Sequence, residues 1–293
     1  SGFLDQLRNK TVEIATEQKK LDAQAVELQT RRNAILNPVR EKLQAALAKE
    51  NGKQEKKGPV DFGAIGHWDF AKGPEDQKGD ADVEFVGNAK INGGALIVGD
   101  GGFGKTKPLT SDLKAKTLEI RIQLDDLDQR AGGAMTLQDL GGGAFDSIVY
   151  SERRPKRWMS GSSGFSRTND FNGTDEKDVA DQPVHLVIAY EANGTIRGYR
   201  NGTAYGRPYV AKNVQDYKKG ASQILFGLRH GTGVSEGRAL RGKIFEARLY
   251  DRALNESEIA ALATGKRDFV SEKEVIDSLT DERQKELFDF ETQ

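Results

Sequence analysis

The stretch of residues 183–262 constrains the fold of this 293-residue chain most strongly. It contains four short runs rich in apolar, β-branched and aromatic residues, at positions 184–190, 195–199, 224–228 and 243–250. Such runs are typical of β-strands. Asn-Gly dipeptides at 193–194 and 201–202 border the second run, and Asn-Gly favours the left-handed backbone of tight hairpin turns. The stretch therefore predicts a meander of antiparallel hairpins.

Further strand-like runs lie upstream, at positions 65–70, 83–86, 95–98, 117–124, 134–137 and 147–150. Glycines punctuate them, and no helical segments alternate with them as a doubly wound parallel sheet would require. Asn255, followed three residues later by Glu258, predicts a capped short helix after the last strand. The fold class is thus mainly β, a two-sheet antiparallel sandwich, for which the chain is long enough with a helical appendage.

The order of these pieces resembles the C-terminal half of laminin-G-like, concanavalin A-like sandwiches. The residues that carry the resemblance are His185, Tyr190, Gly194, Tyr199, Asn201, Gly202, Gly227, Gly242, Glu246, Arg248, Tyr250, Asp251, Arg252, Leu254, Glu258 and Ile259. It implies a jelly-roll sandwich of the lectin-glucanase superfamily. The predicted function is non-catalytic binding of a carbohydrate or a protein, and the alternative is a structural spacer or assembly domain on a helical stalk, with no ligand.

A closer resemblance covers most of residues 60–280. It rests on the segments KTLEIRIQLDDLDQRAGGAMTLQD, FDSIVYSERRPKRWMSGS, YRNGTAYGRPY and FGLRH, which are similar to the insert of planctomycetal proteins that also carry a cytochrome-c-like domain. This resemblance implies a place within a larger exported protein, in the periplasm or at the cell surface. Other domains of that parent protein would then be partners.

The first 35 residues carry a heptad seam typical of a coiled coil. Its members are Leu4, Leu7, Thr11, Ile14, Gln18, Leu21, Ala25, Leu28, Arg32 and Ile35. The Asn37-Pro38 dipeptide predicts the end or a kink of this helix before a second one. The predicted domains are a helical hairpin at 1–50, a charged linker at 51–59, the sandwich at 60–265 and helices at 266–293, the last beginning at a capping box of Ser271 and Glu274.

One amphipathic helix cannot bury its seam alone, so this helix needs a partner. The sequence offers the helix after Asn37, the C-terminal stretch 271–290, or a second copy of the chain. The first two would form a helical stalk within one molecule. The third would form a dimer through the N-terminal helix, and the pattern alone leaves these alternatives open.

Composition excludes several classes of protein. The 44 Lys and Arg residues balance 45 Asp and Glu residues to a net charge of -1, which argues against nucleic acid as a partner. The absence of cysteine excludes disulfides, thiolate metal sites and covalent haem attachment within this segment. No apolar run approaches the roughly 18 residues of a membrane helix, so no membrane insertion is predicted.

Residues 99–106 match the phosphate-loop pattern G-x-x-x-x-G-K-T. That loop binds phosphate only where it opens a helix whose amides point at the ligand. Here Pro108 follows at once and no helical periodicity develops. A hairpin turn between two strands is therefore the favoured interpretation.

A glycosidase would need two carboxylates facing one sugar. The strand motif Glu-x-Asp-x-x-Glu is missing. Glu119 with Arg121, and Glu246 with Arg248, alternate along two strands and predict solvated or cross-strand charge pairs. No serine lies in a G-x-S-x-G elbow, so no enzymatic activity is predicted.

The candidate ligand-binding residues are basic residues clustered around one tryptophan. They are Arg153, Arg154, Lys156, Arg157 and Trp158, followed by Arg167. The ring could stack on a sugar and the cations could bind an anionic sugar or an acidic partner. The alternative is that Trp158 belongs to the core and the arginines pair with Glu152 and nearby aspartates.

No cofactor is required by this interpretation, but calcium is the ion that the family resemblance implies. Calcium takes oxygen ligands from loops, and the candidate metal ligands are Asp76, Asp80 and Asp100. Many members of the resembling family carry an aspartate just before the position of Glu246, where this chain has Phe245.

Overall fold

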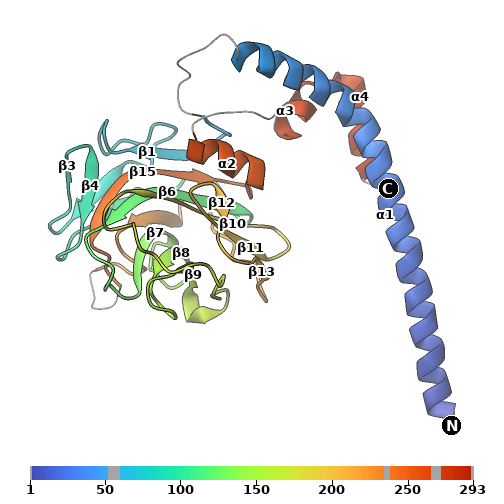
Figure 1. Ribbon diagram of the computed structural model, residues 1–293, viewed down its shortest axis with the longest axis horizontal. Helices are drawn as coiled ribbons and strands as arrows, with labels where there is room; N and C mark the ends of the chain where they lie inside the picture. The colour runs from blue at the N-terminus through green and yellow to red at the C-terminus, as the bar shows by residue number, and fades with distance from the viewer. Residues whose placement is uncertain (1, 52–59, 234–237, 265–271, 292–293) are drawn as a thin grey trace. The chain divides into compact units, whose positions relative to one another are not determined.

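The computed structural model describes residues 2–51, 60–233, 238–264 and 272–291 (Figure 1). The chain divides into two compact units, residues 58–267 on one hand and residues 1–57 with 268–293 on the other. The predicted linker at 51–59, apart from Asn51, lies outside the described residues, as do the boundary at 265–266 and the capping residue Ser271.

The larger unit consists of two antiparallel sheets. The first has the strand order β12-β11-β10-β6-β15-β4-β3, with β1 paired to β15 and β13 paired to β11. Its strands are β1 (Gly66–Asp69), β3 (Lys90–Asn92), β4 (Ala95–Val98), β6 (Lys116–Leu124), β10 (Val184–Tyr190), β11 (Thr195–Arg200), β12 (Thr203–Ala204), β13 (Tyr209–Val210) and β15 (Gly242–Tyr250).

The second sheet has the order β2-β5-β14-β7-β8-β9. Its strands are β2 (Val83–Val86), β5 (Phe103–Thr106), β7 (Gly132–Asp139), β8 (Phe145–Tyr150), β9 (Trp158–Ser162) and β14 (Ser222–Phe226). A short 3-10 turn, η1 (Ser163–Phe165), follows β9. The predicted mainly β, two-sheet antiparallel sandwich is confirmed.

The core of the sandwich lies between the two sheets. Alternate residues of β6, such as Leu118 and Ile120, share one buried cluster with Ile148 of β8, as the period of two along a strand requires. Aromatic rings fill one part of it: the Trp68 ring packs edge-on against Phe226 at 5.3 Å between centroids. This packing fixes which side chains of each strand point inward.

Two local predictions are confirmed by hydrogen bonds. Asn255 accepts the backbone N–H of Glu258 at 3.0 Å, and the Glu258 carboxylate accepts the N–H of Asn255 at 2.9 Å. This capping box starts α2 (Glu256–Thr264). The phosphate-loop match instead forms a hairpin turn, in which Gly99 and Gly102 exchange backbone bonds of 2.8 and 2.9 Å before strand β5.

The predicted helical hairpin at 1–50 is wrong, because α1 (Gly2–Asn51) is one continuous helix with Pro38 inside it. Proline removes one backbone hydrogen bond from a helix. Apolar residues on both sides of the proline pack in one cluster, Ile35 and Leu36 before it and Val39 and Leu43 after it. Burial of that continuous face outweighs the lost hydrogen bond.

The partner of this face is the C-terminal pair of helices, α3 (Glu272–Asp277) and α4 (Asp281–Glu291). Val275, Leu279 and Leu287 share the cluster with Leu36. Nearer the N-terminus, three members of the heptad seam are exposed, namely Ile14, Leu21 and Leu28 at 70%, 51% and 46%. The seam is thus covered within this chain only in its C-terminal part, as far as the described residues show.

Candidate functional site

Loops on either side of β9 surround an open hollow of about 520 Å³. It is lined by Arg153, Arg154, Asn169, Asp170 and Asn172. The exposed ring of Phe165 stands beside it and lies 5.3 Å from the guanidinium of Arg153. Two arginines of the predicted binding cluster therefore line a surface that a ligand can reach.

The backbone around the hollow is held in an uncommon conformation. Ser151, Lys156, Phe165 and Asn172 have φ angles of 57°, 59°, 55° and 55°, in the left-handed region that non-glycine residues rarely adopt. Hydrogen bonds hold two of them: the Lys156 N–H donates to Ser151 Oγ, and the Asn172 N–H donates to the Asp170 carboxylate. Strain of this kind gathers at ligand-binding loops and argues for a positioned surface.

The charges of the hollow do not cancel. Arg157 donates to Asp175 at 2.6 Å, and this hydrogen bond raises the pKa of Arg157. Asp170 lies 3.4 Å from Arg157 and 3.7 Å from Arg154. Of the residues that line the hollow, two are arginines, Arg153 and Arg154, and one is an aspartate, Asp170, so the lining carries a surplus positive charge.

Trp158 lies in the core, so the prediction that its ring faces a ligand is corrected. It is 2% exposed, its ring centroid is 4.9 Å from that of Tyr150, and its indole N–H donates to the Glu176 carboxylate at 2.7 Å. It is an inward residue of β9, facing the sandwich interior like Ser160. Arg200 donates to both oxygens of Glu176.

Arg167 is also absent from the surface and instead joins a charged cluster between the sheets. It is 3% exposed and donates to Asp146 Oδ1 at 2.8 Å. Lys116 lies 2.9 Å from Asp146 Oδ2, and Tyr217 donates to the same oxygen at 3.0 Å. Both Lys116 and Asp146 are at most 1% exposed.

The sequence held a signal for this cluster that was missed. Lys116 has the same strand phase as the core residues Leu118 and Ile120, and Asp146 has the phase of Ile148. Since residues two apart in a strand share a face, both charges had to point inward. The predicted runs at 117–124 and 147–150 begin one residue after these two charges, so neither was assigned to a face of its strand.

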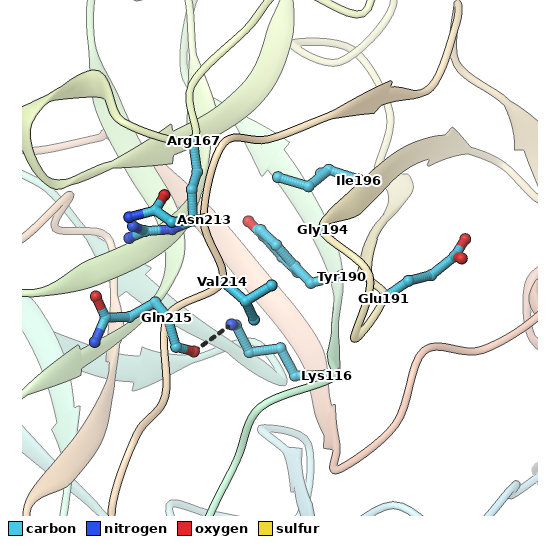
Figure 2. Close-up of a pocket in the computed structure, with 9 residues that line it drawn as sticks. All are labelled: Lys116, Arg167, Tyr190, Glu191, Gly194, Ile196, Asn213, Val214 and Gln215. Carbon is cyan, nitrogen blue, oxygen red and sulfur yellow. Dashed lines mark hydrogen bonds between the residues drawn. The ribbon is translucent and has the colours of Figure 1, made fainter. Parts of the chain in front are cut away.

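A small pocket adjoins this cluster (Figure 2). It is lined by Lys116, Arg167, Tyr190, Glu191, Gly194, Ile196, Asn213, Val214 and Gln215. The space open to the centre of a water-sized sphere is about 10 Å³, roughly what one water molecule needs. Burial lowers the pKa of Lys116, although Asp146 opposes that effect.

A second buried network lies on the outer face of the first sheet. Glu119 accepts hydrogen bonds from Arg248 at 2.9 Å and from Tyr250 at 2.8 Å, and contacts His185 Nε2 at 2.9 Å. Arg248 also donates to Glu246 at 2.5 Å, which contacts His67 at 2.8 Å. Glu119 and Arg248 form one of the expected cross-strand pairs, and it is buried more than it is solvated.

Burial would raise the pKa of Glu119, but its bond to His185 and the charge of Arg248 outweigh it and hold that pKa below its ordinary value. The pKa of Glu246 is lowered in the same way, by His67 and Arg248 against burial. Both carboxylates are thereby held as the anions that balance Arg248.

The candidate metal ligands do not gather into one site within the described residues. Asp76 is buried and accepts the backbone N–H groups of His67 at 2.9 Å and Lys78 at 3.0 Å. Asp80 and Asp100 are exposed, the latter at a left-handed turn position with φ 49°. Among the described residues, no group of three or more acidic or histidine side chains is placed to hold a metal ion.

The described helices include none that is both long and apolar enough to cross a membrane. A search of the curated proteins finds no match to this chain. Among solved structures, domain 4 of AbnA matches with a TM-score of 0.52 and 18% identity, over 68% of this chain and 98% of that one. AbnA is an extracellular GH43 arabinanase from Geobacillus stearothermophilus, and that structure is a complex with arabinotriose.

The sialidase of Trypanosoma rangeli, in its covalent-intermediate complex with 2,3-difluorosialic acid, matches with a TM-score of 0.53 and 18% identity. The match covers 76% of this chain and 38% of the sialidase. At these identities the likeness concerns the fold. The family model of the concanavalin A-like lectin/glucanases superfamily matches residues 99–260, more than half of the chain, and the chain belongs to that superfamily.

Proposed function

We propose that this chain is a non-catalytic recognition module that binds an acidic carbohydrate in the hollow beside β9. The observation that carries the proposal is the hollow itself, about 520 Å³ in volume and lined by Arg153, Arg154, Asn169, Asp170 and Asn172. Its loops are held by the strained backbone at positions 151, 156, 165 and 172. Backbone strain of this kind clusters at ligand-binding sites, so it supports a surface that is positioned for a ligand.

The groups around the hollow suit a sugar acid. The Phe165 ring is 52% exposed and offers the apolar face of a sugar a flat partner. Arg153 and Arg154 supply planar guanidinium groups, which bind carboxylates with two parallel hydrogen bonds. The side-chain amides of Asn169 and Asn172 both donate and accept hydrogen bonds, as sugar hydroxyls require.

The positions of the carboxylates support a role in binding over a role in catalysis. Glycosidases place two carboxyl groups on either side of the scissile bond. In the hollow, Asp170 lies within ion-pair distance of Arg154 and Arg157. Glu119 and Glu246 are tied to one arginine, Arg248, and Glu119 is 4% exposed.

The test is a titration of the protein with oligosaccharides of uronic acids and, as a neutral comparison, with arabinotriose, the sugar in the AbnA complex. The double variant Arg153→Ala/Arg154→Ala should lose at least about tenfold in affinity for the acidic sugar, since a hydrogen bond to a charged group contributes about 1.5–3 kcal/mol. Arg130→Ala is the matched control, because Arg130 is exposed and does not line the hollow.

An equal loss of affinity in the control, or binding of neither sugar class, would contradict the proposal.

Each titration is run with calcium and with a chelator, because the calcium prediction stays open. A calcium effect abolished by Asp80→Asn but not by Arg130→Ala would support that prediction. The exported setting in a larger protein also stays a prediction, supported by the resemblance stated above.

A second candidate function is assembly, in which the chain acts as a spacer that joins copies through α1. The observation that favours it is the exposure of Ile14, Leu21 and Leu28, which are seven residues apart on one helix face. Sedimentation should then show a dimer that Leu21→Glu dissociates, while Gln6→Glu, an exposed position off the seam, has no effect. A wild-type monomer at all concentrations would exclude this function.

A further inference from the structure

The loop that supplies three of the hollow's five lining residues is bonded to a segment of the first sheet. This segment, residues 205–209, leads from β12 into β13. The Arg207 N–H donates to the Phe171 carbonyl at 2.6 Å. Phe171 stands in the chain between two residues that line the hollow, Asp170 and Asn172. The backbone of Arg207 therefore lies directly against the hollow's loop.

Two tyrosines of the same segment hold the loop on either side of this bond. Tyr205 Oη donates to the Thr174 carbonyl at 2.5 Å. Tyr209 Oη donates to the Arg167 carbonyl at 2.8 Å and accepts the Asn169 N–H at 3.2 Å. Burial raises the pKa of each phenol to about 12, so both stay protonated donors at neutral pH. The segment thus fixes the loop at its middle and near both ends.

The two backbones approach so closely that only glycine fits at one position between them. Gly206 has a φ angle of +75°, and an added Cβ would lie 2.0 Å from the Phe171 carbonyl oxygen. A side chain here would force the segment away from the loop. The close approach therefore keeps the next residue, Arg207, beside the hollow.

The side chain of Arg207 is exposed. In the part of the chain that the structure describes, its guanidinium makes no hydrogen bond, ion pair or ring contact. Arg157, by comparison, is engaged by Asp175 at 2.6 Å. A guanidinium carries five N–H donors, so Arg207 has its full donor set available to a ligand.

The loop of residues 167–174 contacts both groups of cations. Asp170 lies 3.7 Å from Arg154 on one connection, and Phe171 is bonded to Arg207 on the other. The two connections belong to different sheets, since β8 and β9 lie in the second sheet and β12 and β13 in the first. The cations therefore occupy two separate positions around one loop.

We propose that Arg207 is a further ligand-binding residue at the rim of the hollow, where it binds the acid group of a second sugar unit. The first unit lies on Arg153 and Arg154, so this inference rests on the proposed sugar binding. It narrows the ligand to a chain of two or more acidic units. A planar guanidinium binds a carboxylate through two parallel hydrogen bonds, which suits uronic acids.

The test compares affinities for a single uronic acid and for an oligomer of uronic acids. Arg207→Ala should weaken binding of the oligomer by about three- to tenfold, as expected of a charge-assisted bond at an exposed position, and should leave binding of the single unit unchanged. Arg207→Lys should recover only part of the loss, because an ammonium lacks the planar fork of donors.

Lys212→Ala is the matched control, because Lys212 is exposed a few residues further along the chain and does not line the hollow; it should bind the oligomer as the wild type does. Arg207→Ala keeps the backbone N–H that bonds to Phe171, so its thermal unfolding midpoint should equal that of the wild type. An equal loss of affinity in the control would show a general effect of charge and overturn the inference.

The two proposals can be told apart by their failures. If Arg207→Ala binds the oligomer as well as the wild type does, while Arg153→Ala/Arg154→Ala loses binding, the inference is overturned and the proposed function stands. A wild type that binds no acidic sugar contradicts the proposed function and the inference with it. A loss confined to the oligomer and to the Arg207 variants supports both.

Discussion

The indole N–H of Trp158 and the carboxylate of Glu176 form a 2.7 Å hydrogen bond inside the protein, where their residues are 2% and 3% exposed. Arg200 donates two further hydrogen bonds to the same carboxylate. The tryptophan therefore anchors a buried carboxylate under the candidate binding loops. This role differs from contact with a ligand and can be separated from it.

Replacing Trp158 by Phe should lower the free energy of unfolding by about 2–4 kcal/mol, from the lost hydrogen bond and the lost ring volume. Binding of the acidic sugar should be unchanged at temperatures where the variant is folded. Urea unfolding and sugar titration measure the two effects. Loss of binding at unchanged stability would show that the ring does act on the ligand.

The lowered pKa values of Glu119 and Glu246 predict an acid limit to stability. A carboxylate whose folded pKa is below its unfolded value stabilises the fold fully above the unfolded pKa and loses that contribution as the pH falls through the folded pKa. The stability contributed by these two groups should therefore decline below about pH 4.5, their ordinary value.

Glu119→Gln tests that limit directly. At pH 7 it should destabilise the sandwich by about 3–5 kcal/mol, because it removes a charged partner of the buried Arg248. Between pH 5 and 3 its unfolding free energy should fall less steeply than that of the wild type. Identical slopes in urea unfolding series would show that Glu119 does not titrate with folding.

Gly227 is a position where a side chain has no room. Its φ angle is +84°, and an added Cβ would lie 2.5 Å from the Cβ of Val98 on the opposite sheet. Gly227→Ala should cost about 2–4 kcal/mol, from backbone strain and overpacking together. Gly101→Ala is the matched control, with φ +87° and nothing within 4 Å, and should cost only about 1–2 kcal/mol. Equal costs would mean that the Val98 contact relaxes.

Replacing Pro38 should stabilise the protein, whereas the substitutions above destabilise it. It lies inside α1 and is exposed, so Pro38→Ala restores a backbone hydrogen bond without disturbing the apolar face. The helical unit should gain up to about 3 kcal/mol, seen as a later loss of helical circular dichroism on heating. Lys42→Ala, exposed on the same helix, should change it by less than about 0.5 kcal/mol. A destabilised Pro38→Ala would show that the proline supports a required bend.

The sandwich could be predicted because its strands alternate strongly. Strands β2, β4 and β10 begin and end where the residue pattern places them. The strands β5 and β9 were missed because their sequences, FGKT and WMSGS, are short and rich in glycine and polar residues. Both segments are strands because they pair with neighbouring strands, and a local residue pattern does not show that pairing.

The candidate site was predictable only in part. The basic run gave Arg153 and Arg154, but exposure of Trp158 and Arg167 depends on strand phase and on partners far away in sequence. Asp146 is 21 residues from Arg167, and Glu176 is 18 from Trp158. Buried ion pairs and solvent-exposed charge runs contain the same residue types. Only the register of the strands shows which of the two a given charged residue belongs to.

The central position of β15 sets the order in which the protein can fold during synthesis. This strand, made of residues 242–250, bonds to β6 on one side and to β4 and β1 on the other. A nascent chain that ends before it has three strands with unpaired edges, which are prone to aggregate. The first sheet can therefore close only after nearly the whole sandwich has left the ribosome, so those edges stay unpaired for most of the time during which the sandwich is being made.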